Sequence, residues 1–582
     1  FTFDTTEASL LLAASDSAFS PNGNKVKDTI TFTPVSKGTD VTKYTFQILD
    51  SAGKSVYTKT ENKKLPTTFV WNGKDDAGIL CIDGKYSAKL AIDTANGSSS
   101  NATTSAFSLD TVAPNLSASS QWTDFSPDED GNQDVLPVKI SSCSSEKSWL
   151  CEVKNSKNET VRHYTWKGIV KDFEWDGRDE SGNIAPDGVY SLVFSSTDEA
   201  GNSFSTSMKN LTLDARETKA YIITEYEGIS PNGDNVLDTQ KFEIKATVTE
   251  NITSWNFEIR QEDGKAVRSW SEKDSANLPA NIVWDGYKAD GTVGEGTFTA
   301  TLSVSYKKGN RVSTVSSPFV CTATPPQLKV QTAPEYFSPD NDGTDDDLFI
   351  RLTGSTKAKI KNWSFTINDP LGKPFWTTAG KSQITERIVW DGLSNVQKNK
   401  STGKAETVQS AMDYPYEFVV TDNLGMTSKV SGVIPVDVLV IRDGNVLKMA
   451  VPSIIFLSDS SEFQKPQGNL TDEQVAKNMQ VLNRITDILK KFKDYKVEIV
   501  GHANRVSDNL DEETVDNMMV WGRALMPLSK ERADAIKNYL IKKGVSASNL
   551  VTDGKGGTEP VADPKDKDNN WKNRRVEFIL QK

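Results

Sequence analysis

Two groups of three aspartates share one spacing along the chain. They are Asp128, Asp130 and Asp134, followed further on by Asp340, Asp342 and Asp346. Carboxylate oxygens are the ligands that calcium prefers in proteins, so each group could hold one calcium ion. The alternative is a turn in which these side chains accept hydrogen bonds from their own backbone amides. No other cofactor is expected from the sequence.

The residues that most often act as nucleophiles or as ligands of transition metals are scarce. The chain has two histidines, His163 and His502, and four cysteines. Two histidines exclude a His-rich metal site and argue against a Ser-His-Asp triad. Cys143 and Cys151 flank a short polar turn, where a cross-strand disulfide is feasible, and both this disulfide and a pair of free thiols remain open.

Two short motifs recur along the first three quarters of the chain. The prolines of a Phe/Ile-Ser-Pro motif are Pro21, Pro127, Pro231 and Pro339, and the tryptophans of a Trp-Asx-Gly motif are Trp71, Trp175, Trp284 and Trp390. The prolines are 106, 104 and 108 residues apart, and the tryptophans are 104, 109 and 106 residues apart. Two independent markers with one period predict four tandem domains. We expect these domains to occupy residues 1–113, 114–215, 216–324 and 325–436.

Each repeat has the alternating apolar pattern of β-strands. Apolar residues occupy every second position before the tryptophan, as in Tyr44, Phe46 and Ile48, and again after it, as in Leu192 and Phe194. A period of two residues indicates antiparallel sheets with one buried face. A unit of about 105 residues with this pattern is typical of an immunoglobulin-like (Ig-like) sandwich. We expect the recurring tryptophan to belong to the core and not to a sugar-binding platform.

The pattern changes to a mixture of helix and strand after residue 436. We expect, in order, a strand at Ser453–Leu457, a helix that a capping box opens at Thr471, a strand at Lys496–Val500, a helix capped by Ser529 and a closing strand at Arg575–Leu580. Residues 437–582 are therefore predicted to form an α+β domain with the order β-α-β-α-β. The whole chain is expected to be multidomain, with four tandem all-β sandwiches followed by this domain.

Two runs of the second repeat are similar to a known bacterial module. Residues 175–183, Trp-Asp-Gly-Arg-Asp-Glu-Ser-Gly-Asn, and residues 186–190, Pro-Asp-Gly-Val-Tyr, resemble the Ig-like domain of the flagellar hook-capping protein FlgD. The Phe-Ser-Pro-Asn-Gly motif also resembles Ig-like repeats of bacterial surface proteins. This resemblance covers roughly residues 15–436 and implies a structural module without a particular activity.

Four motifs of the C-terminal domain carry a second resemblance. They are Val497–Asn504, Leu528–Ala533, Gly554–Gly556 and Asn573–Glu577. In this order they resemble the OmpA-like peptidoglycan-binding family. The resemblance implies a pocket that holds the diamino acid of the peptidoglycan stem peptide noncovalently. An aspartate of the family faces the ammonium group of this ligand, and an arginine pairs with its carboxylate.

Carried over by position, the resemblance assigns Arg532 as the carboxylate partner and puts Asn504 at the aspartate position. Asparagine offers no charge to an ammonium group, so we expect a loss of roughly 1–3 kcal/mol, or about ten- to a hundredfold in affinity. The segment between these residues is longer than in the family. It would be an additional packed helix or a lid, and its acidic residues Asp508 and Asp511–Glu513 could supply the missing charge. The other residues expected at the pocket are Gly501, His502, Ser529, Arg574 and Arg575.

The sequence thus favours a non-enzymatic periplasmic protein of the cell envelope, associated with the outer membrane of a diderm bacterium. Its OmpA-like domain would bind peptidoglycan, while the Ig-like repeats would act as a spacer or as a docking arm for other envelope proteins. The alternative is a degenerate OmpA-like domain without peptidoglycan binding, which would serve as a structural or protein-interaction scaffold. A glycosidase or protease is not expected, because no segment outside the two modules is long enough for a catalytic domain.

Charge and hydropathy limit the remaining classes of function. The chain has 67 Lys+Arg against 79 Asp+Glu and a net charge of −12, unlike the basic proteins that bind nucleic acids. It contains no run of 18 apolar residues, so no transmembrane helix is expected. The sequence opens at Phe1 without a charged leader, and we expect any export signal or lipid anchor to precede it.

Overall fold

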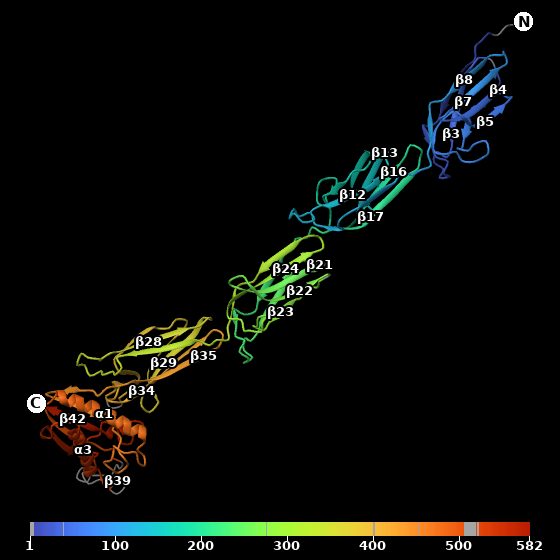
Figure 1. The fold of residues 1–582 in the computed structure, drawn as a ribbon. Coiled ribbons are helices and arrows are strands. Elements are labelled where there is room, and N and C mark those ends of the chain that lie inside the picture. The colour runs from blue at the N-terminus through green and yellow to red at the C-terminus, as the bar shows by residue number, and fades with distance from the viewer. Residues whose placement is uncertain are drawn as a thin grey trace.

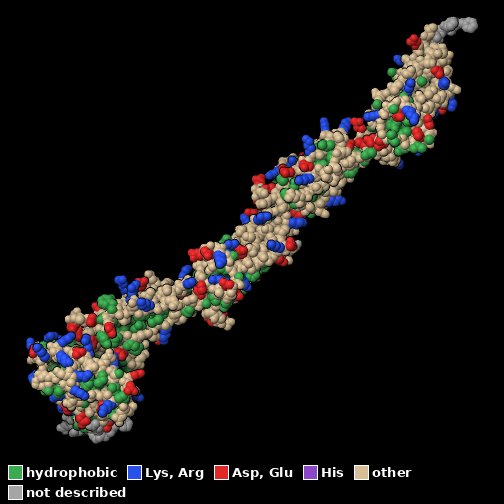
Figure 2. Space-filling view, in the orientation of Figure 1, with side chains coloured by type: hydrophobic (Ala, Val, Ile, Leu, Met, Phe, Trp, Pro, Cys, Tyr) green, Lys and Arg blue, Asp and Glu red, His purple; other side chains and the backbone are tan. Residues whose placement is uncertain are grey.

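The computed structural model has the form of an elongated multidomain molecule. The described residues are 5–38, 40–274, 276–399, 402–452, 454–505, 519–520 and 523–582. Four β-rich repeats follow one another from the N-terminus, and an α+β domain lies at the opposite end (Figure 1). The space-filling view shows a narrow arm along which acidic and basic side chains are interspersed (Figure 2). The predicted fold class is confirmed.

Repeats 1 and 2 each pack a three-stranded sheet on a larger one. The strands of repeat 1 are β1 (Ser9–Ala14), β2 (Ala18–Phe19), β3 (Ile30–Lys37), β4 (Val41–Asp50), β5 (Ser55–Glu61), β6 (Phe69–Trp71), β7 (Gly84–Thr94), β8 (Ser99–Thr103) and β9 (Phe107–Leu109). The strands of repeat 2 are β10 (Leu116–Ser119), β11 (Asp124–Phe125), β12 (Leu136–Cys143), β13 (Glu146–Lys154), β14 (Thr160–Gly168), β15 (Phe173–Trp175), β16 (Gly188–Thr197) and β17 (Ser203–Leu213). The sheet orders are β1-β3-β6 with β2-β9-β7-β4-β5, where β8 pairs with β7, and β10-β12-β15 with β11-β17-β16-β13-β14.

Repeats 3 and 4 follow the same plan. The strands of repeat 3 are β18 (Ala220–Thr224), β19 (Gly228–Ile229), β20 (Gln240–Ala246), β21 (Ile252–Gln261), β22 (Ala266–Lys273), β23 (Asn281–Trp284), β24 (Gly296–Tyr306), β25 (Arg311–Val315) and β26 (Phe319–Cys321). Those of repeat 4 are β27 (Gln327–Ala333), β28 (Leu348–Ser355), β29 (Ile360–Asn368), β30 (Pro374–Gly380), β31 (Arg387–Trp390), β32 (Leu393–Lys398), β33 (Ala405–Thr407), β34 (Asp413–Asp422) and β35 (Thr427–Pro435). Repeat 3 forms the sheets β18-β20-β23 and β19-β26-β24-β21-β22, with β25 on β24, and repeat 4 forms β27-β28-β31, β30-β29-β34-β35 and the separate hairpin β32-β33.

The recurring tryptophan lies in the core of every repeat, as predicted. Trp71, Trp175, Trp284 and Trp390 are each at most 1% exposed. In repeat 2 the indole Nε1 of Trp175 donates to the carbonyl oxygen of Arg178 at 3.1 Å, so its one polar atom is satisfied. Its ring centroid lies 5.3 Å from that of Phe125 and 5.0 Å from that of Tyr190.

The two recurring motifs meet in space, which explains why they share one period. Gly177 of the Trp-Asp-Gly motif has a φ of +72°, and a Cβ atom there would lie 2.9 Å from Pro127 of the Phe-Ser-Pro motif. Glycine is therefore needed both for the backbone conformation and for the close approach. The corresponding distances are 2.7 Å for Gly73 and Pro21, 2.6 Å for Gly286 and Pro231, and 2.8 Å for Gly392 and Pro339.

The two cysteines of repeat 2 are free thiols. Of the two alternatives that the sequence left open, the structure therefore has the pair of thiols and not the Cys143–Cys151 disulfide. Cys143 ends β12 and Cys151 lies in β13, and these strands belong to opposite sheets of the sandwich. The chain between them crosses from one sheet to the other and does not form a hairpin. The amide of Val170 donates to Cys143 Sγ at 3.3 Å, while burial raises the pKa of the Cys151 thiol to about 12.

In the described part of the C-terminal domain, the helices α1 and α3 pack on a five-stranded sheet. Its elements are β36 (Ile441–Asp443), β37 (Val446–Val451), α1 (Asp472–Lys491), β38 (Lys496–Gly501), β39 (Met519–Val520), β40 (Arg523–Ala524), α3 (Leu525–Lys542), η1 (Ala547–Asn549), β41 (Leu550–Gly554), η2 (Asn570–Asn573) and β42 (Val576–Gln581). The sheet order is β36-β37-β42-β38-β41, and the core contains residues of both helices. The predicted β-α-β-α-β order is confirmed, with β36, β41 and the short pair β39-β40 as additional strands. Within the described ranges, neither helix is long and apolar enough to cross a membrane.

The first helix begins as predicted, but residues 454–457 of the strand expected at Ser453–Leu457 form no strand, while Ser453 lies outside the described residues. A capping box at Thr471 opens α1. The strand that precedes α1 is β37, which ends at Val451. The next residue, Pro452, has no amide hydrogen to continue the ladder. The buried side chain of Asn478 then accepts from the amide of Ile455 at 2.8 Å and donates to its carbonyl oxygen at 2.7 Å. These two bonds take the backbone groups that a strand partner would need.

The second helix starts one turn earlier than predicted. Helix α3 begins at Leu525, and its N-cap residue is Ala524, which makes no side-chain capping bond. Ser529 is therefore not a cap but a fully buried residue inside the helix. Its Oγ donates to the carbonyl oxygen of Met526 at 2.9 Å and accepts from the amide of Gly556 at 3.0 Å.

Ion pairs hold α1 of the C-terminal domain close to the end of repeat 4. Arg484 of α1 forms a two-pronged pair with the buried carboxylate of Asp437, the residue that directly follows repeat 4, with N–O distances of 2.6 and 3.0 Å. Lys477 of the same helix pairs with Asp413 of β34 at 2.6 Å. These contacts fix the orientation of α1 relative to the last repeat.

Candidate functional site

Two glycines allow the C-terminal ends of β38 and β41 to lie directly against α3. A Cβ atom at Gly501 would overlap the carbonyl oxygen of Ser529, and one at Gly554 would lie 2.6 Å from the amide nitrogen of Lys530. Real Cβ atoms essentially never approach backbone atoms so closely. Gly501 is thus a residue that brings the strand end and the helix together, and the chain beyond it leads to His502 and Asn504.

Gly501→Ala is expected to destabilise the C-terminal domain by about 3 kcal/mol, because the methyl group would force β38 and α3 apart. Chemical unfolding followed by circular dichroism measures this change. The matched control is Gly84→Ala at a strand position where a Cβ atom meets nothing within 4 Å. Equal stabilities of the two variants would contradict the role given to Gly501.

Arg532 contacts the segment that connects β37 to α1. Its Nε donates to the carbonyl oxygen of Ser460 at 3.0 Å, and its Cζ lies 4.9 Å from the ring centroid of Phe456. A cation over an aromatic face is attracted by the ring, so both contacts favour one orientation of the side chain. Sequence reasoning identified Arg532 but missed Ser460 and Phe456, because these two residues come from the segment between β37 and α1.

Asn504 is bound to a loop that precedes the last strand. Its Oδ1 accepts from Asn573 Nδ2 at 2.9 Å, and its Nδ2 has a long bond of 3.4 Å to the carbonyl oxygen of Pro564. Asn573 is 1% exposed, and its Oδ1 accepts from the amides of Val561 and Ala562, both at 2.8 Å. Asn573 thus positions Asn504, a role that the Asn-Arg-Arg motif alone did not indicate.

The two arginines that follow have different surroundings. Arg574 is exposed, whereas Arg575 is 7% exposed. Arg575 Nε donates to Glu577 Oε1 at 2.6 Å, and its terminal nitrogen donates to the carbonyl oxygen of Glu559 at 3.1 Å. Arg575 is therefore engaged in the domain itself, which leaves Arg574 as the more accessible candidate for a ligand.

His502 is buried beside this arginine. It is 3% exposed, and neither ring nitrogen has a hydrogen-bond partner among the described residues. Burial lowers the pKa of His502 to about 4, and the nearby positive charge of Arg575 acts in the same direction. Glu577, whose Oε1 lies 3.8 Å from the ring, opposes this shift only in part. A neutral imidazole with this pKa is a structural element of the strand end.

The low pKa of His502 predicts how stability depends on pH. An unfolded histidine has a pKa of about 6.5, so the unfolded chain binds a proton before the folded chain does. Stability is complete above about pH 6.5 and falls as the pH drops toward 4, by up to about 2 kcal/mol between pH 7 and pH 5. An NMR titration measures the pKa directly, with a His163→Gln variant to assign the two imidazole signals. A His502 signal that titrates near pH 6.5 would contradict the burial argument.

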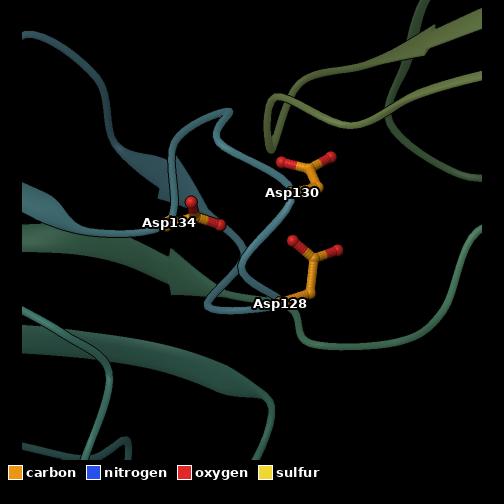
Figure 3. A group of neighbouring side chains, drawn as sticks. All are labelled: Asp128, Asp130 and Asp134. Carbon is orange, nitrogen blue, oxygen red and sulfur yellow. The ribbon is translucent and has the colours of Figure 1, made fainter.

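The aspartate triplets lie in the loops of the Phe-Ser-Pro motif. One oxygen from each of Asp128, Asp130 and Asp134 lies within 4.8 Å of the others, and the same holds for the second triplet, Asp340, Asp342 and Asp346. Figure 3 shows the first triplet around one loop of repeat 2. Its side chains also accept local amides, as Asp130 does from Asn132 at 2.7 Å and Asp134 from Gly131 at 2.9 Å. The turn geometry is therefore present, and calcium binding stays a prediction.

The expected residues of the C-terminal pocket thus fall into two sets. Gly501, His502, Ser529 and Arg575 pack inside the domain, whereas Asn504 and Arg532 are partly exposed and Arg574 is exposed. The acidic residues of the long insertion, Asp508 and Asp511–Glu513, lie outside the described residues.

Family comparisons identify both modules of the chain. Residues 463–574 match the model of the OmpA family, and residues 23–96 and 129–200 match that of the FlgD Ig-like domain. The chain therefore carries an OmpA-family domain at its C-terminal end and FlgD-type Ig-like domains in its N-terminal part.

Two relatives each match about a fifth of this chain. The peptidoglycan-binding protein ArfA of Mycobacterium tuberculosis is 31% identical over 113 residues, which are 19% of this chain and 31% of ArfA. The peptidoglycan-associated lipoprotein of Buchnera aphidicola is 31% identical over 110 residues, 19% of this chain and 54% of the lipoprotein. This chain thus spans about a third to a half of these relatives. A solved tetra-tandem repeat from the extending region of a large adhesion protein covers 73% of this chain and 99% of its own, at 16% identity and a TM-score of 0.27.

Proposed function

We propose that this chain is a non-enzymatic protein of the bacterial cell envelope. Its OmpA-family domain binds the peptidoglycan stem peptide noncovalently in the periplasm. The family match includes Asn504, Arg532 and the segment up to Arg574. Two of the relatives, a peptidoglycan-binding protein and a peptidoglycan-associated lipoprotein, support the same ligand class.

The orientation of Arg532 is the observation that carries this proposal. The guanidinium group is planar and can bind both oxygens of a carboxylate at once. Since Ser460 and Phe456 already hold the side chain, little rotamer entropy is lost when a ligand carboxylate binds. Asn504 would accept a hydrogen bond from the ammonium group through its amide oxygen, without a counter-charge.

A second candidate function is a protein-interaction scaffold that has lost the ligand. The observation in its favour is that Asn504 is uncharged and already bound to Asn573. Both candidates predict the same fold, but they differ in affinity for the wall.

Co-sedimentation of the full chain with purified sacculi separates the two candidates. The proposal predicts saturable binding that Asn504→Asp strengthens about ten- to a hundredfold, because a carboxylate adds charge opposite the ligand ammonium. This substitution is compatible with the fold, since aspartate can still accept from Asn573 and loses only the long bond to Pro564. Binding by Asn504→Asp alone would favour the scaffold, and no binding by either chain would overturn the wall-binding proposal.

We propose further that the four repeats act as a spacer. Their arrangement in one row, with the OmpA-family domain at the far end, supports this role (Figure 1). So does the joint between repeats 2 and 3, where the buried Lys308 donates to the carbonyl oxygens of Asp214 and Arg216 at 3.1 and 2.6 Å. Such contacts hold neighbouring repeats in one relative orientation.

A further inference from the structure

The first aspartate triplet lies at the joint between two repeats. Its loop in repeat 2 faces the turn between β24 and β25 of repeat 3, which is drawn in yellow-green in Figure 3. Asn310 of this turn donates its Nδ2 to Asp128 Oδ2 at 2.6 Å and to Asp130 Oδ2 at 3.0 Å. A Cβ atom at Gly309 would lie 2.8 Å from the carbonyl oxygen of Asn132, so the two backbones are in close contact.

Among the described residues, one carboxylate oxygen and one amide oxygen at this joint are buried without a hydrogen-bond partner, Asp134 Oδ1 and Asn310 Oδ1. The hydroxyl of Ser126 in the same loop also lacks a partner, but so do its counterparts Ser20 and Ser230 in repeats 1 and 3, so the serine does not distinguish this joint. Asn310 as a whole is 3% exposed. Leaving a buried acceptor unsatisfied costs about 1–3 kcal/mol, more for a charged group, and native proteins rarely tolerate it without a reason.

The joint between repeats 1 and 2 has the same geometry, but among its described residues no amide or carboxylate oxygen of the loop is buried without a partner. Asn22 and Asn24 stand where repeat 2 has Asp128 and Asp130. Asn22 Nδ2 donates to Asn202 Oδ1 at 2.7 Å, which satisfies the residue that corresponds to Asn310. Repeat 2 has Asp128 at the position of Asn22. A carboxylate has no hydrogen to donate, so the amide oxygen of Asn310, which faces Asp128, has no donor there.

The aspartate that closes each loop shows the same difference. In repeat 1 both oxygens of Asp28 accept backbone amides, from Gly23 and Lys25, each at 2.9 Å. The corresponding residues of repeats 3 and 4, Asp238 and Asp346, also use both oxygens. In repeat 2, Asp134 Oδ2 accepts a hydrogen bond from the amide of Gly131. Its second oxygen, Oδ1, has no hydrogen-bond partner among the described residues. Among these loops, the carboxylate oxygen without a partner thus belongs to the loop of repeat 2, which also has three carboxylates.

We infer that the joint between repeats 2 and 3 binds a calcium ion, held by Asp128, Asp130 and Asp134 and by the amide oxygen of Asn310. A half-turn of the Asn310 amide exchanges its nitrogen and oxygen and directs Oδ1 toward the carboxylates. The ion offsets the repulsion between three carboxylates and satisfies both buried oxygens. Calcium accepts six to eight oxygen ligands in irregular arrangements, whereas magnesium requires an octahedron. The four side chains, with water as the remaining ligands, therefore suit calcium better than magnesium.

The second triplet lacks the features that carry this inference. Asp340 Oδ2 already accepts from the amide of Val440 at 2.9 Å, and both oxygens of Asp346 accept amides. The neighbouring domain contributes a backbone donor there and not an amide oxygen. Calcium is therefore assigned to the middle of the arm, where it links repeat 2 to repeat 3.

Calorimetric titration of the chelator-treated full chain with calcium chloride tests this inference. We expect one site with a dissociation constant of about 0.1–1 mM, the range of extracellular calcium modules. Asp130→Asn is expected to weaken binding at least tenfold. Asn310→Ala is expected to weaken it about threefold or more and to reduce the stabilisation of repeats 2 and 3 by calcium in thermal unfolding.

The matched control is Asp342→Asn, which makes the same change in repeat 4 and should leave the titration unchanged. Absence of binding up to about 10 mM calcium, or binding that Asp130→Asn leaves unaltered, would overturn the assignment. The test involves no peptidoglycan, so its outcome is independent of the proposed wall binding.

Discussion

Arg532→Ala is expected to lower the affinity of the full chain for sacculi by about a hundredfold or more. The substitution removes both hydrogen bonds of the guanidinium fork to the ligand carboxylate, which are worth roughly 3 kcal/mol together. Co-sedimentation over a range of sacculus concentrations measures the loss. Arg532→Lys should be intermediate, because lysine keeps the charge but not the planar fork.

The control for this prediction is Arg442→Ala. Arg442 is exposed on β36, at the edge of the sheet opposite to β41, and carries the same charge. Its removal should leave binding nearly unchanged, apart from a small electrostatic effect at low salt. Equal losses in Arg442→Ala and Arg532→Ala would mean that the wall attracts general positive charge, contrary to a defined pocket. Circular dichroism checks that the Arg532 variants keep the fold despite their lost contacts with Ser460 and Phe456.

Trp175→Ala is expected to lower the unfolding free energy of repeat 2 by about 3–5 kcal/mol. The side chain is fully buried, packs between Phe125 and Tyr190, and would leave a cavity that the two sheets cannot close. Because each repeat has its own core, scanning calorimetry should show one transition at a lower temperature and the others nearly unchanged.

The matched control is Trp166→Ala in the same repeat. Trp166 is only half-buried on β14, where it lies against Tyr164 and Phe173, so we expect a smaller loss of about 1–2 kcal/mol. A shift of every transition in Trp175→Ala would show that the repeats unfold together, and equal effects of the two variants would contradict the central role of Trp175.

Features that depend on local patterns were predictable from the sequence. The period of the two motifs gave four repeats, and the buried tryptophans follow from the alternation around Trp71 and its counterparts. The Thr471 capping box needs only residues three positions apart, and the structure has it. The order of helices and strands along the chain and the buried face of each element depend on local patterns. The spacing of apolar residues is therefore enough to predict them.

Features that depend on contacts between distant segments were not predictable. The spacing of Cys143 and Cys151 suits a hairpin, but the local sequence does not indicate that β12 and β13 lie in opposite sheets. The motif around Gly501 was identified, but not the close approach to Ser529 that requires glycine there. Asn310 is 180 residues away from Asp130, and its contact exists only because repeat 3 docks on repeat 2.

The most direct test of the proposed function is a calorimetric titration of the full chain with a soluble stem peptide that contains a diamino acid. The account predicts saturable one-to-one binding that Asn504→Asp strengthens and Arg532→Ala removes. It also predicts that amidation of the ligand carboxylate weakens binding of the native chain as much as Arg532→Ala does, because both changes remove the same ion pair. Binding that is insensitive to Arg532→Ala and to amidation, or no binding by native and Asn504→Asp chains alike, would contradict it.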